Sequence, residues 1–417
     1  MDNTRTLSWQ AILCWLTVLL EGYDMVALGA SSLALRHSDT LHITDSRLTV
    51  ISTITLVGVM IGAVCVTPLA DVIGRRKVLI ASVATFSVFT LLLPLAPNYQ
   101  VFAGLRLFAG FGLGACMPTA LTAMAEYLPV HRRARANTTT MTGYHFGAVA
   151  ASLLAIAAAQ NWRVVFIGGG VVGLALVGIM LFKLTETGST GTPETTGPQD
   201  HDAEKVTLLD LLRPKFLGRT IAVWISTFMG LLLVYGLNTW LPRLMEAAGY
   251  NMSASVTMLL VVNAGGIAGM LLAGYLADTR GVSRTVLVWF GAGAVLLALL
   301  SIRITSSVLL DVIIFFAGVF VFSAQVLVYA YVTHSYPDRI RGAALGITSG
   351  VGRLGAITGP LFTGVLATAG VAYPWGFYFF AAAAVLGLVA MAAAPAVRRV
   401  DESDTHHQPS ASHPGAS

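Results

Sequence analysis

Apolar runs of about twenty residues follow one another along most of the chain, and this pattern limits the possible folds more than any other. Twelve such runs lie near residues 9–33, 49–70, 78–96, 100–125, 137–159, 163–184, 219–241, 256–277, 285–302, 308–332, 342–369 and 373–395. As a helix, a run of this length crosses the roughly 30 Å hydrocarbon core of a bilayer. Only 11% of the 417 residues are charged, against roughly 25% in soluble domains. Because the sequence lacks the ten-residue alternation of outer-membrane barrels, we expect an all-α membrane protein with twelve transmembrane helices.

A polar segment separates the first six runs from the last six. Residues 185–205 are rich in Thr, Gly, Pro and acids and contain almost no apolar residue, and the chain beyond residue 396 is similar. Such compositions are typical of flexible linkers and tails. We therefore predict an N-terminal six-helix bundle over 1–184, a cytoplasmic linker over 185–218, a C-terminal six-helix bundle over 219–395 and a disordered cytoplasmic tail over 396–417.

The basic residues predict the orientation of the chain in the membrane. Of the 25 Lys and Arg residues, 18 lie in the segments that share a side with the N-terminus, five lie in the opposite loops, and Arg106 and Arg353 lie inside spans. Cytoplasmic loops of membrane proteins are enriched in Lys and Arg. We therefore expect both termini in the cytoplasm of a bacterium, with the protein in its inner membrane.

The two groups of six runs repeat each other. "TPLADVIGRRK" at 67–77 follows the second run, and "GYLADTRGVSR" at 274–284 follows the eighth, so that Asp71 and Gly74 correspond to Asp278 and Gly281 with an offset of 207. "EYLPVHRRARA" at 126–136 matches "HSYPDRIRGAA" at 334–344 with an offset of 208. Two matches in the same order indicate duplicated halves. Secondary transporters are often built this way, with the substrate site between the repeats near the bilayer midplane.

These loops resemble the "GxLADRxGRRK" signature of the major facilitator superfamily, although Thr67 stands where Gly is usual and Val72 where a base is usual. Three further segments resemble the aromatic acid:proton symporter family within it, namely "EGYDMVALG" in the first run, residues 106–136, and "YGLNTWLPRLM" at 235–245. The first motif usually reads DGxD there, so Glu21 replaces an Asp. The resemblance implies two pseudo-symmetric six-helix bundles and uptake of benzoate-, hydroxybenzoate- or gentisate-like carboxylates driven by the proton gradient.

Two acids in the first run are the strongest candidates for proton coupling. Glu21 and Asp24 are three residues apart and therefore share a helix face. A charge at the centre of a membrane helix costs about 2.5–3.5 kcal/mol, so such residues usually face a partner or a wet cavity. Two neighbouring carboxylates resist ionising together, and one of them could exchange a proton. The alternative is that one acid only pairs with an interior arginine.

Three further titratable or cationic residues lie inside spans. Arg353, in "SGVGRLGAITGP", could hold a substrate carboxylate through its two-pronged guanidinium or could be a structural counter-ion. Arg106 is expected to pair with a first-span acid or to act in gating. His145 occupies the position in the fifth span that Arg353 occupies in the eleventh. It could sense protons or bind substrate, or it could only hydrogen-bond a neighbouring helix.

Aromatic and amide side chains in the spans are candidates for the wall of a site for an aromatic acid. Such sites have apolar walls with a few polar groups, although most aromatic residues in spans serve packing or the membrane interface. Asn238 is the strongest of these candidates because a buried amide must find a partner. The others are Tyr23, Tyr144, Tyr235, Trp240, Gln325 and Tyr329.

A further set of charged residues lies at the predicted cytoplasmic ends of the spans. We predict that they hold the halves closed on the inner side, because positive-inside topology explains the bases but not the acids. The set comprises Asp71, Arg75, Arg76, Glu126, Arg133, Asp278, Arg284, His334 and Arg341.

The leading hypothesis is proton-coupled import of an aromatic carboxylate by rocker-switch alternating access. The alternatives are proton-antiport export of drugs or metabolites on the same fold, and a non-transporting sensor. The glycines at 110, 112 and 114 follow no strand and do not indicate nucleotide binding, and the sequence shows no Walker motif, metal-ligand spacing or nucleophile triad. We therefore expect no enzyme activity, no cofactor besides the proton gradient, no nucleic-acid partner, and a monomer in the bilayer.

Overall fold

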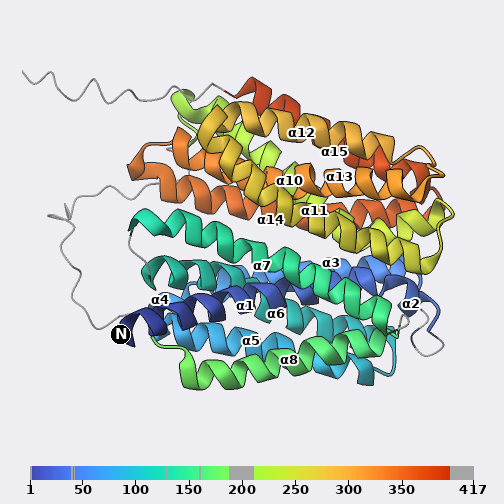
Figure 1. Cartoon of the computed structure of the whole chain (residues 1–417), viewed down its shortest axis with the longest axis horizontal. Helices are drawn as coiled ribbons and strands as arrows, with labels where there is room; N and C mark the ends of the chain where they lie inside the picture. Colours follow the sequence, from blue (N-terminus) through green and yellow to red (C-terminus); the bar gives the residue numbers. More distant parts are fainter. Residues whose placement is uncertain are drawn as a thin grey trace, which may run out of the picture.

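The computed structural model describes residues 2–38, 41, 43–127, 130–158, 161–186 and 211–394. The predicted tail and most of the predicted linker lie outside this range. The described residues are helical apart from short turns (Figure 1). The helices of the first half are α1 (Asp2–Ala30), α2 (Ser32–Arg36), α3 (Asp45–Cys65), α4 (Leu69–Ile73), α5 (Arg75–Leu92) with the 3₁₀ turn Leu93–Leu95, α6 (Tyr99–Tyr127), α7 (Val130–Ala157) and α8 (Trp162–Lys183). Those of the second half are α10 (Pro214–Ala247), α11 (Met252–Arg280), α12 (Val282–Leu299), α13 (Ser307–Ser335), α14 (Asp338–Thr368) and α15 (Ala372–Ala393).

The twelve long helices correspond to the twelve apolar runs. Eleven of those in the described part of the chain are both long and apolar enough to cross a membrane. The twelfth, α14, has the length, at 31 residues, but not the apolarity. It packs against α10 and α3. Helix α10 begins at Pro214, within the predicted linker, because proline is well suited to the first position of a helix.

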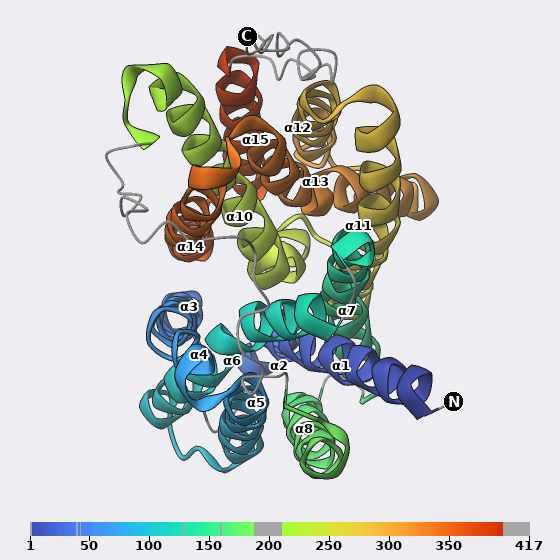
Figure 2. The same ribbon diagram turned by 90° about the vertical axis from the view of Figure 1, so that its left-hand side faces the viewer.

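The two halves lie side by side, with their long helices roughly parallel to the long axis of the molecule (Figure 1). We call the end at which α1 begins the terminal end, and the opposite end, which carries α2, the far end. Figure 2 looks onto the terminal end. The halves meet where α7 packs against α11, where α3 packs against α14, and where α1 and α2 touch α10.

Close backbone approaches join the halves toward the far end. A Cβ atom on Gly29, near the end of α1, would lie 2.0 Å from the backbone oxygen of Asn238 in α10. A Cβ on Gly364, near the end of α14, would lie 1.9 Å from Oγ1 of Thr49 in α3. Since atoms cannot approach so closely, larger side chains at either glycine would push the halves apart here.

The same face of α14 is open toward the terminal end. At about 100° of rotation per residue, Gly342, Gly346 and Gly350 lie within about 40° of Gly364 around the helix. A Cβ on any of these three would meet no described atom within 4 Å. The contact between α14 and α3 is therefore tight at Gly364, whereas the same face of α14 meets no described atom at the three glycines nearer the terminal end.

Candidate functional site

Asp24 forms a buried ion pair inside the first half. The side chain belongs to α1 and is 1% exposed. Its Oδ1 lies 2.5 Å from Nη1 of Arg106 in α6, and its Oδ2 accepts a hydrogen bond from the Thr90 hydroxyl of α5. Nε of Arg106 also donates to Oγ1 of Thr55 in α3, at 3.3 Å. Loss of one partner from a buried pair costs about 3–5 kcal/mol, so these contacts tie α1, α3, α5 and α6 together.

Glu21, about one turn earlier on α1, faces the other half. It is 2% exposed, and its Oε2 has no hydrogen-bond partner among the described residues. The guanidinium of Arg353, in the second half, acts electrostatically on Glu21, Tyr144 and Tyr235. Glu21 and Tyr144 come from one half and Arg353 and Tyr235 from the other, so this group of four lies at the interface of the halves.

Arg353 is held in place by the packing of its own helix. A Cβ on Gly355 would lie 2.1 Å from the backbone oxygen of Phe228, so α14 presses directly against α10 beside the arginine. The guanidinium has no ion-pair or hydrogen-bond partner within the described residues. An arginine with unused donors can bind a carboxylate through two parallel hydrogen bonds, so this position suits an organic anion.

A chain of polar side chains crosses the interface through a residue that sequence reasoning missed. Nδ1 of His145 in α7 lies 2.9 Å from Oδ1 of Asn263 in α11. Nδ2 of Asn263 donates to Oδ1 of Asn238 in α10, also at 2.9 Å. The ring of Phe322 stacks on His145 with centroids 5.0 Å apart. Asn263 could have been found by the argument applied to Asn238, because it too is an amide inside an apolar run.

Several buried polar atoms on these helices have no partner among the described residues. Buried polar groups are nearly always hydrogen-bonded to protein, water or ligand, so these exceptions are candidates for contact with a bound polar molecule. The atoms are Glu21 Oε2, Tyr144 Oη, Asn238 Nδ2, Trp240 Nε1, and both Oε1 and Nε2 of Gln325.

Tyr23 does not share the direction of Glu21. Its hydroxyl donates to the backbone oxygen of Val165 in α8 at 2.7 Å, and its ring packs against Gly169 of the same helix. Two residues along a helix are about 200° apart, so Tyr23 points into the first half when Glu21 points toward the second. The structure therefore places Tyr23 away from the interface group to which it was assigned from sequence.

A second ionic group joins the halves at the far end, and we call it the far-end cluster: Arg36, Asp45, Arg243 and Glu246. Nε and Nη2 of Arg243 donate to the two oxygens of Asp45 at 3.0 and 3.1 Å. Nη1 of Arg243 lies 2.8 Å from Oε2 of Glu246, while Arg36 approaches both acids at 3.7 and 3.6 Å. Arg36 and Asp45 belong to the first half and the other two to the second.

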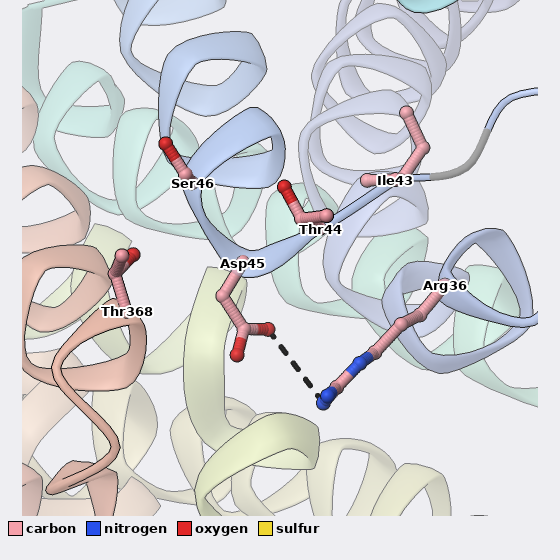
Figure 3. A pocket seen from close by; sticks show the side chains of 6 residues that line it. All are labelled: Arg36, Ile43, Thr44, Asp45, Ser46 and Thr368. Carbon is pink, nitrogen blue, oxygen red and sulfur yellow. Dashed lines mark ion pairs between the residues drawn. The ribbon is translucent and has the colours of Figure 1, made fainter.

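The far-end cluster borders a pocket between the halves. The pocket has a volume of about 490 Å³, and Figure 3 shows Asp45 and Arg36 beside it, with Thr368 of α14 on the opposite side. Asp45 is fixed there because Thr44 caps α3, accepting a hydrogen bond from the backbone N–H of Arg47. An acid in the first turn also interacts favourably with the helix dipole.

Comparison with known proteins identifies the family. The family model described as "Major Facilitator Superfamily" matches residues 14–349 and 284–416. The chain belongs to the major facilitator superfamily. It is therefore a multi-pass membrane transporter rather than an enzyme, and its twelve long helices form the two six-helix bundles of that fold.

Relatives within the superfamily are named as transporters of aromatic acids. The chain is 33% identical to a gentisate transporter of Corynebacterium glutamicum over 90% of its own length and 85% of that protein. It is 29% identical to a gallate transporter of Pseudomonas putida over 95% of its length and 93% of that protein. A bacterial homologue of the lysosomal transporter Spinster, solved in an inward-facing conformation, has the same fold, with a TM-score of 0.74 and 18% identity over 93% of this chain and 96% of the other.

The charged residues predicted to hold the halves closed on the inner side lie at the terminal end of the transporter. Arg76 there donates to the backbone oxygens of Leu184 and Leu181, and Arg341 donates to that of Tyr336, so these bonds stay within one half. Asp278, Arg284 and His334 are exposed, and Arg75 begins α5. The side chains of Asp71, Glu126 and Arg133 lie outside the described residues. Contact between the halves through this set stays a prediction, whereas the ion pairs between described side chains that join the halves lie at the far end.

Proposed function

We propose that this transporter imports aromatic carboxylates together with protons across the bacterial inner membrane by alternating access. The names of its relatives support the substrate class. The excess of Lys and Arg in the segments at the terminal end supports a cytoplasmic position for that end and for both termini. In this orientation, the far-end cluster joins the halves on the outer side, and the loose part of the contact between α14 and α3 lies on the cytoplasmic side.

One observation supports the substrate class most directly: Arg353 is a cation at the interface of the halves that has no hydrogen-bond or ion-pair partner among the described side chains. A membrane-embedded charge is costly, and it is usually retained for function. The substrate carboxylate supplies the anion that Arg353 lacks, and the aromatic rings of Tyr144, Tyr235 and Tyr329 supply an apolar wall. An exporter of cations would gain nothing from an arginine at this point.

Glu21 makes substrate binding depend on a proton. When ionised, its carboxylate competes with the substrate carboxylate for the field of Arg353. When a proton from the outside neutralises Glu21, the positive charge of Arg353 can attract the substrate carboxylate without competition. Release on the cytoplasmic side reverses the sequence: the substrate leaves, the proton follows, and Glu21 again compensates Arg353. In this sequence of steps, Glu21 and Arg353 act only through their charges and their hydrogen bonds.

Asp24 contributes by holding or releasing Arg106. Protonation of Asp24 removes the charge that binds Arg106, while Thr90 can still hydrogen-bond the neutral acid. The contact between α1 and α6 then weakens, and α1 carries Glu21 with it. The movement of the halves also requires the far-end cluster to separate, because its bonds span the gap that must open to the outside.

Uptake into proteoliposomes tests this function. Labelled benzoate, 4-hydroxybenzoate and gentisate are offered with an inward proton gradient, and at least one should accumulate above equilibrium and be lost when a protonophore is added. Arg353→Gln should raise the KM for that acid about 10- to 100-fold, because a charged bidentate contact of about 1.5–3 kcal/mol is removed.

The matched control is Arg303→Gln, which removes an exposed charge from the loop after α12 and should leave the KM unchanged. If no aromatic acid accumulates with the gradient, the proposal is wrong. Gradient-driven loss of preloaded substrate would favour export instead.

A further inference from the structure

Gln325, in α13, is a buried side chain whose hydrogen-bonding groups are all unused within the described part of the chain. It is 5% exposed, and neither Oε1 nor Nε2 has a partner among the described residues. An amide offers two N–H donors and an oxygen with two lone pairs. Burial of such a group without partners is unfavourable, so an apolar residue would suit this position better unless a bound molecule uses the amide.

The neighbours of Gln325 on its helix place it in the group that faces the interface. Phe322, Gln325 and Tyr329 follow the i, i+3, i+7 spacing of one helix face. Phe322 stacks on His145 of the first half. Tyr329 interacts electrostatically with Tyr235, and Tyr235 also interacts electrostatically with Arg353. Gln325 therefore lies on one helix face between Phe322, which contacts the first half, and Tyr329, which lies near Tyr235.

Helix α10 leaves a space for the amide. A Cβ on Gly230 would lie 2.4 Å from Oε1 of Gln325, closer than two such atoms can approach. Any larger residue at 230 would displace the amide. The position of Gln325 is thus set by the packing of α10 against α13, as expected for a group that orients a ligand.

We propose that Gln325 binds a hydroxyl group on the aromatic ring of the substrate, so that the transporter prefers hydroxylated aromatic acids to the unsubstituted acid. The inference rests on the proposed function, in which Arg353 binds the carboxylate. A carboxylate only accepts hydrogen bonds, whereas a phenolic hydroxyl both donates and accepts. Nε2 donates a hydrogen bond to the hydroxyl oxygen, and Oε1 accepts a hydrogen bond from the hydroxyl O–H. Asn238 is less suited to this, because one of the two lone pairs of its oxygen already accepts from Asn263.

Substrate discrimination in Gln325→Leu tests the proposal. Initial uptake of benzoate and of 2-, 3- and 4-hydroxybenzoate is measured in proteoliposomes for both proteins. The unmodified transporter should take up at least one hydroxybenzoate with a Vmax/KM about tenfold or more above that for benzoate, since a site that hydrogen-bonds a hydroxyl discriminates against the analogue without it. The variant should lose about tenfold for that isomer and stay within about threefold for benzoate.

Two results would overturn the proposal: equal uptake of benzoate and every hydroxybenzoate by the unmodified transporter, or an equal loss for all acids in Gln325→Leu. The second result would show that the amide binds water or packs only. Failure of the proposed function looks different, because the unmodified transporter would then accumulate no aromatic acid.

Gly230→Ala provides a second variant that keeps the amide. It should push Gln325 from its position and lower uptake of the preferred hydroxybenzoate more than uptake of benzoate. An equal effect on both acids would count against the proposal even if Gln325→Leu failed to fold.

Discussion

Two carboxylate–arginine pairs in this transporter have similar chemistry and different positions. Asp24 and Arg106 are 1% and 0% exposed and both belong to the first half. The side chains of Asp45 and Arg243 are 12% and 15% exposed, and their two hydrogen bonds connect the first half to the second. The first pair lies among four helices of one bundle, and the second lies at the far-end rim.

The difference in position separates two tasks. A rigid-body movement of the halves leaves every distance inside one half unchanged, so the Asp24–Arg106 pair can survive it and respond to a proton instead. The Asp45–Arg243 pair cannot survive separation of the far end, because its two members move with different halves. Stability of a bundle should therefore depend on the first pair, and the balance between conformations on the second.

The largest effect is expected from Asp24→Asn. The asparagine keeps the shape of the side chain but leaves the buried charge of Arg106 without its anion, which should cost about 3–5 kcal/mol of stability. Gradient-driven accumulation should be abolished, because position 24 no longer exchanges a proton. Melting temperature in detergent and uptake in proteoliposomes measure the two effects.

The double variant Asp24→Asn/Arg106→Gln separates stability from coupling. It removes both charges, so most of the lost stability should return while accumulation stays absent. Counterflow exchange of substrate, which needs no net proton movement, should continue at a measurable rate in the double variant. Proton-driven accumulation in either variant would exclude Asp24 from the coupling mechanism.

A smaller effect, on conformation rather than on stability, is expected from Arg243→Gln. This change removes the bonds to both Asp45 and Glu246, and a loss of about 1–2 kcal/mol should shift the balance toward the far-end-open form about 5- to 30-fold. A cysteine in place of Ser46, which lines the far-end pocket, reports on the shift when Cys14, Cys65 and Cys116 are replaced by alanine. A membrane-impermeant maleimide should then label it faster from outside in the variant.

Arg303→Gln controls for the loss of one positive charge at the same end, and it should leave the labelling rate unchanged. Arg36→Gln should increase the rate less than Arg243→Gln, because its contacts of 3.6 and 3.7 Å are longer and its side chain is 39% exposed. Identical labelling of the unmodified and Arg243→Gln proteins would show that the far-end cluster does not hold the halves together.

The comparison also shows what a single sequence can predict. Helix number and fold follow from the lengths of the apolar runs and from the duplicated loops, because both can be read from the order of residues along the chain. Charged residues inside spans are equally visible, and Asp24, Arg106 and Arg353 are candidates on that ground. The partner of each charge depends on helix rotation, so the sequence left open whether Arg106 pairs with Asp24 or with Glu21.

The far-end cluster could not be predicted in this way. Arg36, Asp45, Arg243 and Glu246 lie near span ends, where charges are common and need no partner. Their contact arises only from the tilt of one half against the other, which is a property of the conformation rather than of any local pattern. For the charged residues predicted on the inner side the difficulty is the reverse. The sequence identifies these residues, but their contacts across the halves would form only when the terminal end closes.

The smallest effects are expected from two tyrosines, which test the same division between bonds inside a half and groups at the interface. Tyr23→Phe removes the bond to Val165 inside the first half and should cost about 0.5–1.5 kcal/mol of stability with uptake nearly unchanged. Tyr144→Phe removes a hydroxyl that has no partner among the described residues, so it should preserve the melting temperature and raise the KM severalfold. If Tyr23→Phe impaired uptake and left the melting temperature unchanged, Tyr23 would belong to the interface between the halves. Bonds inside a half and groups at the interface would then not have separate roles.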